Sequence, residues 1–227
     1  MTFFEIINDC LSELNYKQAS SFAGLTNADD LKVMDEVNNV NREISLAEDW
    51  YFRQQKTSFT ITANTTEFTN PIVGKIALIM VGSTEYIYSS NFDDFYSGTA
   101  SGTSYGLFSE KILFASCPTE RTATIYYYTN YPAKTAAGTL KSSMTLTDDV
   151  SIIPEQFRRD VLVYGACLRT RAMTKHVKYG SWLASYLNAI KALRSGCLRT
   201  KSEQAYISTD NRPRKIDSAY SFGDLYG

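Results

Sequence analysis

The hydrophobic period of the chain changes twice, and this pattern limits the folds that it can adopt. Apolar residues recur every three or four positions at 3–14 and again from Val33 to Tyr51, which predicts amphipathic helices. From about Thr57 apolar and polar residues alternate, and β-branched and aromatic residues are enriched, which predicts strands. The helical period returns at Pro154. The chain therefore combines helices and strands in separate segments.

These periods divide the chain into four parts. We expect N-terminal helices at 1–56, an inserted β-rich domain at 57–150, C-terminal helices at 151–206 and an extended C-terminal tail at 207–227. The two helical parts are expected to pack together as one antiparallel-type bundle, from which the β-rich domain is an excursion with a sandwich or barrel-like form. The predicted fold class is α+β.

Local signals indicate where the helices begin and which side chains they bury. Thr26 followed by Asp29 is typical of a helix N-terminus, and Pro154 suits the first position of a helix because its missing N–H needs no partner there. The helix that begins at Pro154 is expected to continue to about Lys175. The expected core anchors are Trp50, Phe52, Phe157, Tyr164 and Trp182.

The composition argues against an enzyme. The chain has one histidine, His176, which excludes sites that need several imidazoles, and its four cysteines form no CxxC pair. The acid pairs Asp29–Asp30, Asp93–Asp94 and Asp148–Asp149 lie in polar stretches, where turns and helix starts are more typical than acid–base catalysis. We predict no catalytic residue, no metal site and no cofactor.

The sequence also lacks the signal of a membrane-spanning helix. No apolar run approaches the ~20 residues that such a helix needs. The run Ile72–Val81 is interrupted by Gly74 and Lys75. No membrane association is expected.

Charge is segregated along the chain, although the net charge is only −1. Residues 1–50 hold ten acidic and three basic residues, whereas residues 156–201 hold ten basic residues and one acidic residue. Such opposite charges favour contact between the two segments, either within one chain or between neighbouring copies. The basic segment could instead meet nucleic-acid phosphates. A pI of about 5.9 is low for a dedicated nucleic-acid-binding domain, which favours contact with the acidic segment.

Three features follow one another in a fixed order along most of the chain. A helix ends in the tryptophan–aromatic segment AEDWYFRQQ (47–55), a β-rich block ends in TIYYYTNYP (124–132), and an Ile-Pro-initiated helix follows in DDVSIIPEQFRRDVLVYGACLRTRAM (148–173). In this order and spacing the chain resembles the head-to-tail adaptor (connector) proteins of tailed bacteriophages, the group that contains the tail tubular protein A of short-tailed phages. It departs from them at EFTNPIVGK (67–75), where a tyrosine–leucine–proline step is usual.

The resemblance implies a structural virion protein that is assembled in the host cytoplasm. Such adaptors form a homo-oligomeric ring of about twelve copies, which docks on the portal protein at the virion neck. The ring extends the DNA channel, through which double-stranded DNA passes without sequence-specific binding, and offers an attachment surface to a downstream tail or nozzle protein. The resemblance also implies that the C-terminal tail binds the portal, through Ile216, Tyr220, Phe222, Leu225 and Tyr226.

A ring needs two different faces on each subunit, and the segregated charges could supply them. We expect part of the basic segment to face a neighbour's acidic surface, so reversing Arg158 and Arg159 to Glu should weaken assembly. Two other functions remain open: a nucleic-acid-binding module that uses the basic helices, and a virion-associated cell-wall hydrolase that uses acid pairs. The inter-subunit candidates are Arg158, Arg159, Arg169 and Arg171.

Overall fold

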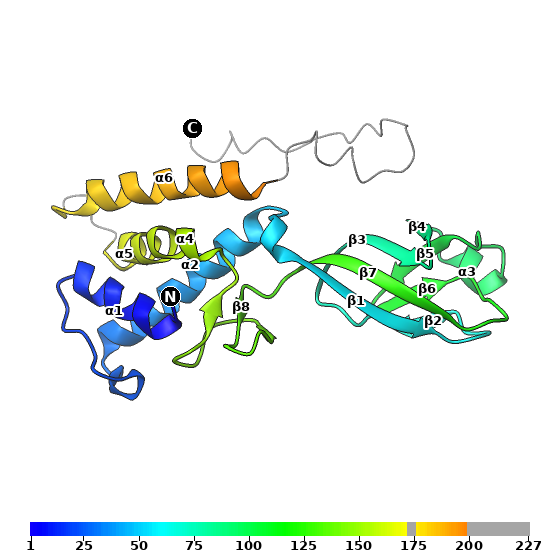
Figure 1. The fold of residues 1–227 in the computed structure, drawn as a ribbon, viewed down its shortest axis with the longest axis horizontal. Coiled ribbons are helices and arrows are strands. Elements are labelled where there is room, and N and C mark those ends of the chain that lie inside the picture. The colour runs from blue at the N-terminus through cyan, green and yellow to red at the C-terminus, as the bar shows by residue number, and fades with distance from the viewer. Residues whose placement is uncertain (172–175, 199–227) are drawn as a thin grey trace.

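The computed structural model describes residues 1–171 and 176–198. Helices gather at one end of an elongated molecule, and a curled seven-stranded sheet forms the other end (Figure 1). The predicted α+β class is confirmed. The expected C-terminal tail lies outside the described residues.

The helical part is built from segments at both ends of the sequence. Thr2 and Glu5 form a capping box at the start of the first helix, since the Thr2 hydroxyl accepts from the Glu5 N–H (3.3 Å) and the Glu5 carboxylate accepts from the Thr2 N–H (2.7 Å). The main helices are α1 (Phe3–Glu13), α2 (Ala28–Ala47), α4 (Glu155–Arg158), α5 (Tyr164–Thr170) and α6 (Tyr179–Cys197).

Two predicted helix starts are each wrong by one residue. The N-cap of α2 is Asn27 and not Thr26, because the Asn27 side chain accepts the Asp30 N–H at 2.9 Å. Pro154 precedes its helix as the N-cap, and the first helical residue is Glu155. Caps are therefore fixed by individual hydrogen bonds that the hydrophobic period does not reveal.

The long helix that was expected from Pro154 to about Lys175 is divided. A π-helical segment, η3 (Arg159–Val163), separates α4 from α5, and α5 ends at Thr170. The segment contacts α1, α2 and α6, so the three successive residues 161–163 are all fully buried. Such enclosure on several sides removes the one-sided pattern from which an α-helix is predicted.

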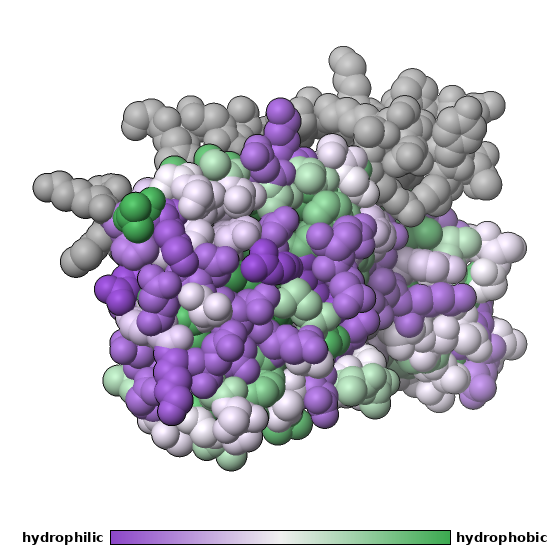
Figure 2. Space-filling view, turned by 60° about the vertical axis from the view of Figure 1, so that its left-hand side comes forward, coloured by the Kyte–Doolittle hydropathy of each residue, from purple (hydrophilic) through white to green (hydrophobic). Residues whose placement is uncertain are grey.

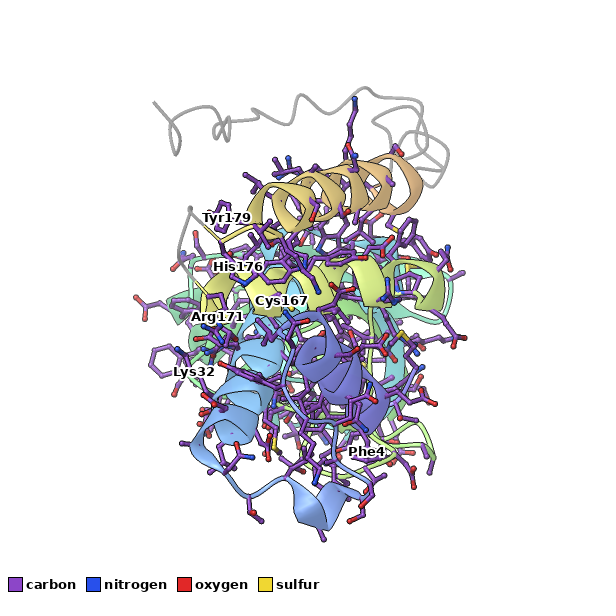
Figure 3. The ribbon with its side chains drawn as sticks, turned by 90° about the vertical axis from the view of Figure 1, so that its left-hand side faces the viewer. Phe4, Lys32, Cys167, Arg171, His176 and Tyr179 are labelled. Carbon is purple, nitrogen blue, oxygen red and sulfur yellow. The ribbon has the colours of Figure 1, made fainter. Side chains whose placement is uncertain are left out.

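The helices form three levels, which Figures 1 and 3 show from two directions. Helix α6 is outermost, α4, η3 and α5 lie in the middle, and α1 and α2 lie on the other side. A Cβ at Gly165 would lie only 2.8 Å from Val40 and 2.9 Å from Tyr186, so the middle level needs glycine to approach both of its neighbours. The chain direction of α2 and α6 is the same in Figure 1, and α5 runs the opposite way.

Large aromatic side chains fill the core of the helical part. Trp50 and Trp182 are each 1% exposed, and the Trp50 indole N–H donates to the Ile44 carbonyl at 2.7 Å. Phe52 stacks on Trp50 with 5.7 Å between ring centroids. Phe52, Phe157 and Tyr164 are partly buried against the same cluster. These five are the residues proposed as core anchors.

The large sheet has the strand order β1-β7-β3-β4-β5-β6-β2, and β4 and β5 form its parallel pair. Its curl brings rings from β1, β2 and β6 together, with centroids 5.8–6.0 Å apart for Phe59, Phe68 and Phe114. The sheet is therefore curled, although its edge strands β1 and β2 are not paired with each other. The strands are β1 (Gln54–Ile61), β2 (Glu67–Thr69), β3 (Gly74–Val81), β4 (Thr84–Tyr88), β5 (Ser104–Phe108), β6 (Lys111–Phe114) and β7 (Arg121–Thr129), with the short helix α3 (Asp93–Ser97) after β4.

A smaller sheet packs on the helical part. Most of its residues lie in the segment 57–150, which was expected to form the β-rich domain. It contains β8 (Ala133–Lys134), β9 (Leu140–Lys141) and β10 (Val150–Ser151). Polar side chains of α2 hold it: Asn41 donates to the Pro132 carbonyl at 2.9 Å and accepts from the Ser151 hydroxyl at 2.5 Å. These hydrogen bonds connect α2 to residues more than 90 positions later in the chain.

One arginine connects the helical part to the large sheet. Arg53 is 4% exposed and lies in the short turn η2 (Tyr51–Arg53) before β1. It donates to the Thr129 carbonyl (2.9 Å), the Glu48 carbonyl (2.7 Å) and the Asn130 side chain (3.1 Å). Burial lowers the pKa of its guanidinium, and the Asp49 carboxylate opposes that effect. Arg53 therefore fixes the point at which β1 and β7 leave the helices.

Candidate functional site

The four candidate arginines lie in or directly after the middle level of helices, where α4, η3 and α5 place them. Arg158 ends α4, Arg159 begins the π-helical segment, and Arg169 and Arg171 lie at the end of α5. They point toward different neighbours, so the structure does not join them into one cluster.

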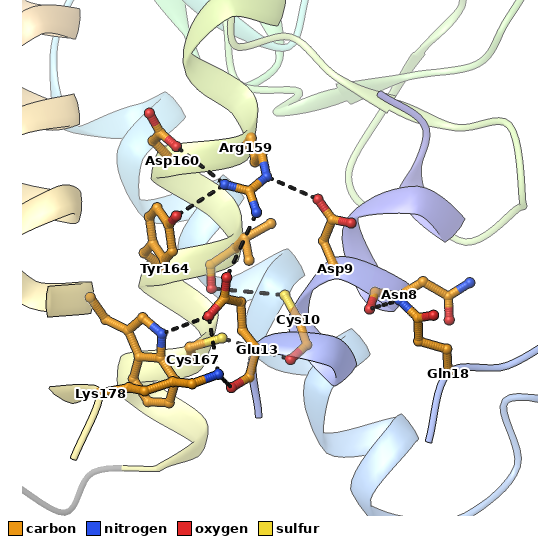
Figure 4. Close-up of polar contacts among 12 residues, drawn as sticks. Asn8, Asp9, Cys10, Glu13, Gln18, Arg159, Asp160, Tyr164, Cys167 and Lys178 are labelled. Atoms are coloured by element: carbon orange, nitrogen blue, oxygen red, sulfur yellow. Dashed lines mark hydrogen bonds and ion pairs between the residues drawn. The ribbon is translucent and has the colours of Figure 1, made fainter. Parts of the chain in front are cut away.

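Arg159 contacts the acidic end of α1 (Figure 4). Its Nε lies 3.1 Å from the Asp9 carboxylate, and another guanidinium nitrogen lies 3.7 Å from Glu13. It also donates to the Tyr164 hydroxyl at 3.0 Å, and this hydrogen bond raises the pKa of the Arg159 guanidinium. Because η3 turns Arg159 toward α1, the π-helical segment sets which acids this arginine meets.

Glu13 connects all three levels of helices. Its carboxylate accepts from the Trp182 indole at 3.2 Å and lies 3.6 Å from the Lys178 ammonium, while Arg159 approaches from the middle level. Lys178 also donates to the Glu13 backbone carbonyl at 2.9 Å. Cations here compensate both the carboxylate and the negative end of the α1 dipole. This cluster ties α6 to α1.

The other candidate arginines also make contacts within their own chain. Arg169 forms an ion pair with Glu43 and lies 4.0 Å from Glu36, both on α2. Arg158 donates to the backbone carbonyls of Ile153 (2.8 Å) and Met1 (3.3 Å), and burial lowers the pKa of its guanidinium.

Arg171 lies at the end of the helical part that is turned toward the viewer in Figure 3. Its guanidinium lies over the Tyr16 ring, 5.1 Å from the centroid. Its Nε is buried without a hydrogen-bond partner in the described part of the chain. Nearby, Lys32 of α2 donates to the Thr170 carbonyl at 3.3 Å, so a second cation covers the last turn of α5.

The expected attraction between the acidic and the basic segments is confirmed within one chain. Arg159 and Lys178 meet the acids of α1, Arg169 meets α2, and Arg194 lies 3.4 Å from Glu48. The helical end of the molecule is accordingly mostly hydrophilic, with hydrophobic residues in small separate patches (Figure 2). A role of the four arginines between subunits stays a prediction.

The acid pairs have structural roles. Asp29 lies in the first turn of α2 and Asp93 in that of α3, while Asp94 accepts from the Thr99 hydroxyl at 3.2 Å. Asp149 is buried, and it pairs with Lys141 and accepts the backbone N–H of Thr145 (2.7 Å) and of Leu146. Although burial raises the pKa of Asp149, these partners together hold it below its usual value.

His176 lies outside the helices, because α5 ends at Thr170 and not near Lys175 as expected. Its ring stacks on Trp182 with 4.9 Å between centroids, and its Nδ1 accepts the Lys178 N–H at 3.2 Å. Across residues 1–171 and 176–198, no three His, Cys, Asp or Glu side chains are grouped in a way that could hold a metal ion. In the same residues, no helix has both the length and the apolar character to cross a bilayer.

The large sheet exposes apolar side chains on β4, β5 and the short helix α3. Ile87 and Tyr88 of β4, Tyr96 of α3 and Phe108 of β5 are each 49–56% exposed. The alternation of apolar and polar residues in the sequence did not identify these exposed side chains, because it does not distinguish an exposed aromatic residue from a buried one. The five tail residues proposed for portal binding, Ile216, Tyr220, Phe222, Leu225 and Tyr226, lie outside the described residues.

The comparison with protein families identifies one family over most of the chain. The model of the SU10 adaptor protein family matches residues 1–214. The chain belongs to the SU10 adaptor protein family. The resemblance to phage head-to-tail adaptors is thereby confirmed, and membership indicates a structural adaptor role in a phage virion. No curated protein matches the chain.

Proposed function

We propose that this adaptor forms a ring of about twelve copies beneath the portal at the virion neck. The ring extends the DNA channel and attaches the downstream tail or nozzle protein. The observation that carries the proposal is the family match over residues 1–214. The two-part shape supports it, since helices with charged faces and a sheet with exposed aromatic residues offer different surfaces to different partners.

The portal contact is assigned to the C-terminal tail at 207–227. Its apolar residues, Ile216, Tyr220, Phe222, Leu225 and Tyr226, are separated by polar ones, which suits a segment that becomes ordered on its partner. The attachment surface for the tail protein is assigned to the large sheet, where β4, β5 and α3 expose apolar side chains.

We infer that double-stranded DNA passes through the ring without sequence-specific binding, because many of the basic residues already form ion pairs within their own chain. Arg159, Arg169, Lys178 and Arg194 each lie within 4.0 Å of a carboxylate of the same chain. Phosphate contacts would have to replace these ion pairs. This weakens the alternative of a dedicated nucleic-acid-binding module.

Mass photometry of the purified protein, with and without the portal ring of its phage, tests the proposal. We expect the portal peak to gain the mass of about twelve copies. A variant truncated after residue 206 should lose this association, and a variant with Lys17→Glu should keep it. No association at physiological salt would contradict the proposal. Tight DNA binding with a steep salt dependence in a gel shift would then favour the nucleic-acid-binding module.

A further inference from the structure

The outer face of α6 has no neighbour among the described helices. Leu183 is 37% exposed and Leu187 is 55% exposed, and Lys191 follows on the same face after another four residues. Ala184 and Asn188 between them are small and exposed. In the part of the chain that the structure describes, Lys191 forms no ion pair. This face is therefore a narrow apolar stripe that ends in one positive charge.

A groove lies on the opposite side of the three levels, between α2 and the segment after β9. Asn38 fixes its wall, because it donates to the Met144 carbonyl at 3.0 Å and accepts the Met144 N–H at 2.9 Å. Leu31 (50% exposed) lies one helical turn before the lining residue Asp35, and Leu146 (60% exposed) directly follows the lining residue Thr145. The groove is lined by Met34, Asp35, Asn38, Asn39, Ser143, Met144 and Thr145.

Asp35 supplies the charge of this groove. It is exposed, and within residues 1–171 and 176–198 no ion pair involves it. The other acids of α2 with known ion pairs, Glu36 and Glu43, already meet Arg169. Asp35 is thus available to a cation from outside the chain.

The two surfaces match in spacing and direction. Leu187 precedes Lys191 by four residues and Leu31 precedes Asp35 by four, so in each case the apolar side chain and the charge are about 6 Å apart along the helix. Helices α6 and α2 have the same chain direction (Figure 1). Neighbouring subunits of a twelve-membered ring differ by a rotation of only about 30°, so α6 of one copy and α2 of the next would keep this direction.

We propose that the α6 face of one copy packs against the α2 groove of the next copy, with Lys191 opposite Asp35. The proposal rests on the ring proposed above and names the surfaces that close it. The two faces are different and lie on opposite sides of the subunit, which is the heterologous arrangement that generates rings. The order α6, α5, α2 would then repeat from subunit to subunit around the ring.

Charge exchange between the two positions tests this interface. Asp35→Lys and Lys191→Asp should each raise the concentration needed for half-maximal assembly at least about tenfold, because like charges then meet at every contact. The double variant restores an opposite pair and should assemble like the wild type. An equimolar mixture of the two single variants should also assemble, because alternating copies place opposite charges together.

Matched controls carry the same charge changes elsewhere. Lys17→Asp and Glu120→Lys alter exposed residues outside both surfaces and should leave assembly unchanged. As a second measurement, Asp35→Cys combined with Lys191→Cys should give a ladder of covalent oligomers with a short bismaleimide, since the four native cysteines are buried. A far-UV circular dichroism melt of each variant checks that it folds.

The outcomes separate this interface from the ring itself. If the wild type forms rings with the portal and both single variants do so equally well, the interface is wrong and the proposed function stands. If the single variants lose portal binding and neither the mixture nor the double variant restores it, the α6 face serves the portal instead, which also overturns the proposal. If the wild type neither assembles nor binds the portal, the proposed function fails, and the interface fails with it.

Discussion

The helical part and the large sheet are stabilised by different interactions. Arg159, Lys178 and Arg169 connect separate helices through ion pairs. In the sheet, rings of Phe59, Phe68, Phe114 and Tyr86 meet at 5.8–6.0 Å. Ion pairs therefore connect the helices around their apolar core, whereas ring packing closes the sheet. Salt should weaken the ion pairs between the helices and leave the ring packing of the sheet almost unchanged.

The largest effect is expected from Phe114→Ala, which should destabilise the sheet by about 3–5 kcal/mol. Phe114 is 1% exposed and contacts three other rings. Both tryptophans lie in the core of the helical part, so tryptophan fluorescence reports on that part alone. In urea, the far-UV circular dichroism transition should shift to lower concentration while the fluorescence transition shifts less.

Phe108→Ala is the matched control, because Phe108 is 50% exposed and its loss should cost under about 1 kcal/mol. Equal shifts of both transitions in Phe114→Ala would show that the two parts unfold as one unit. The helical part and the large sheet would then differ in the interactions that stabilise them but not in their stability.

A smaller effect is expected at the junction. Arg53→Met removes a donor from two buried backbone carbonyls and from Asn130, which should cost about 2–3 kcal/mol in urea unfolding. The fluorescence and circular dichroism transitions should also move apart, because Arg53 couples the two parts. Arg53→Lys keeps the charge and should recover part of the loss. A midpoint unchanged in Arg53→Met would mean that β1 and β7 hold the junction without this side chain.

The smallest effect is expected from the exposed ion pairs. A double-mutant cycle of Glu13→Gln and Arg159→Gln should give a coupling of about 0.5–1 kcal/mol at low salt. At 1 M NaCl the Debye length is about 3 Å, so the coupling should decrease strongly, whereas the cost of Phe114→Ala should not decrease. A coupling that is independent of salt would contradict the proposed difference between the two parts.

Much of the helical part was predictable, because its signals are local or follow from simple electrostatics. The period of Val33, Val37 and Val40 gave α2, and the segregation of charge indicated that the acidic and basic segments meet. The particular partners of Arg159 were not predictable, since they depend on the π-helical turn. Arg53 was also missed, because arginine is rarely buried and nothing in its neighbourhood marks it as an exception.

The sheet was predictable in content but not in order. Strands such as β7 have clear alternation, yet the paired residues of β1 and β7 are 60 to 74 positions apart, and no local pattern records that contact. The parallel pair β4–β5 depends on the path of the chain through α3. The contact of the smaller sheet with α2 was not predictable for the same reason, because the hydrogen bonds of Asn41 that hold the sheet join distant residues.

The pairing of Gln54 with Tyr128 places the entrance and the exit of the large sheet side by side. A segment whose two ends lie next to each other can be lengthened, shortened or exchanged during evolution without moving the structure from which it emerges. In the ring proposed above, the helical part can therefore stay constant while the sheet diversifies to match different tail proteins. If the sheet holds the tail protein as proposed, recombination between phages that share this framework transfers tail compatibility as a single cassette.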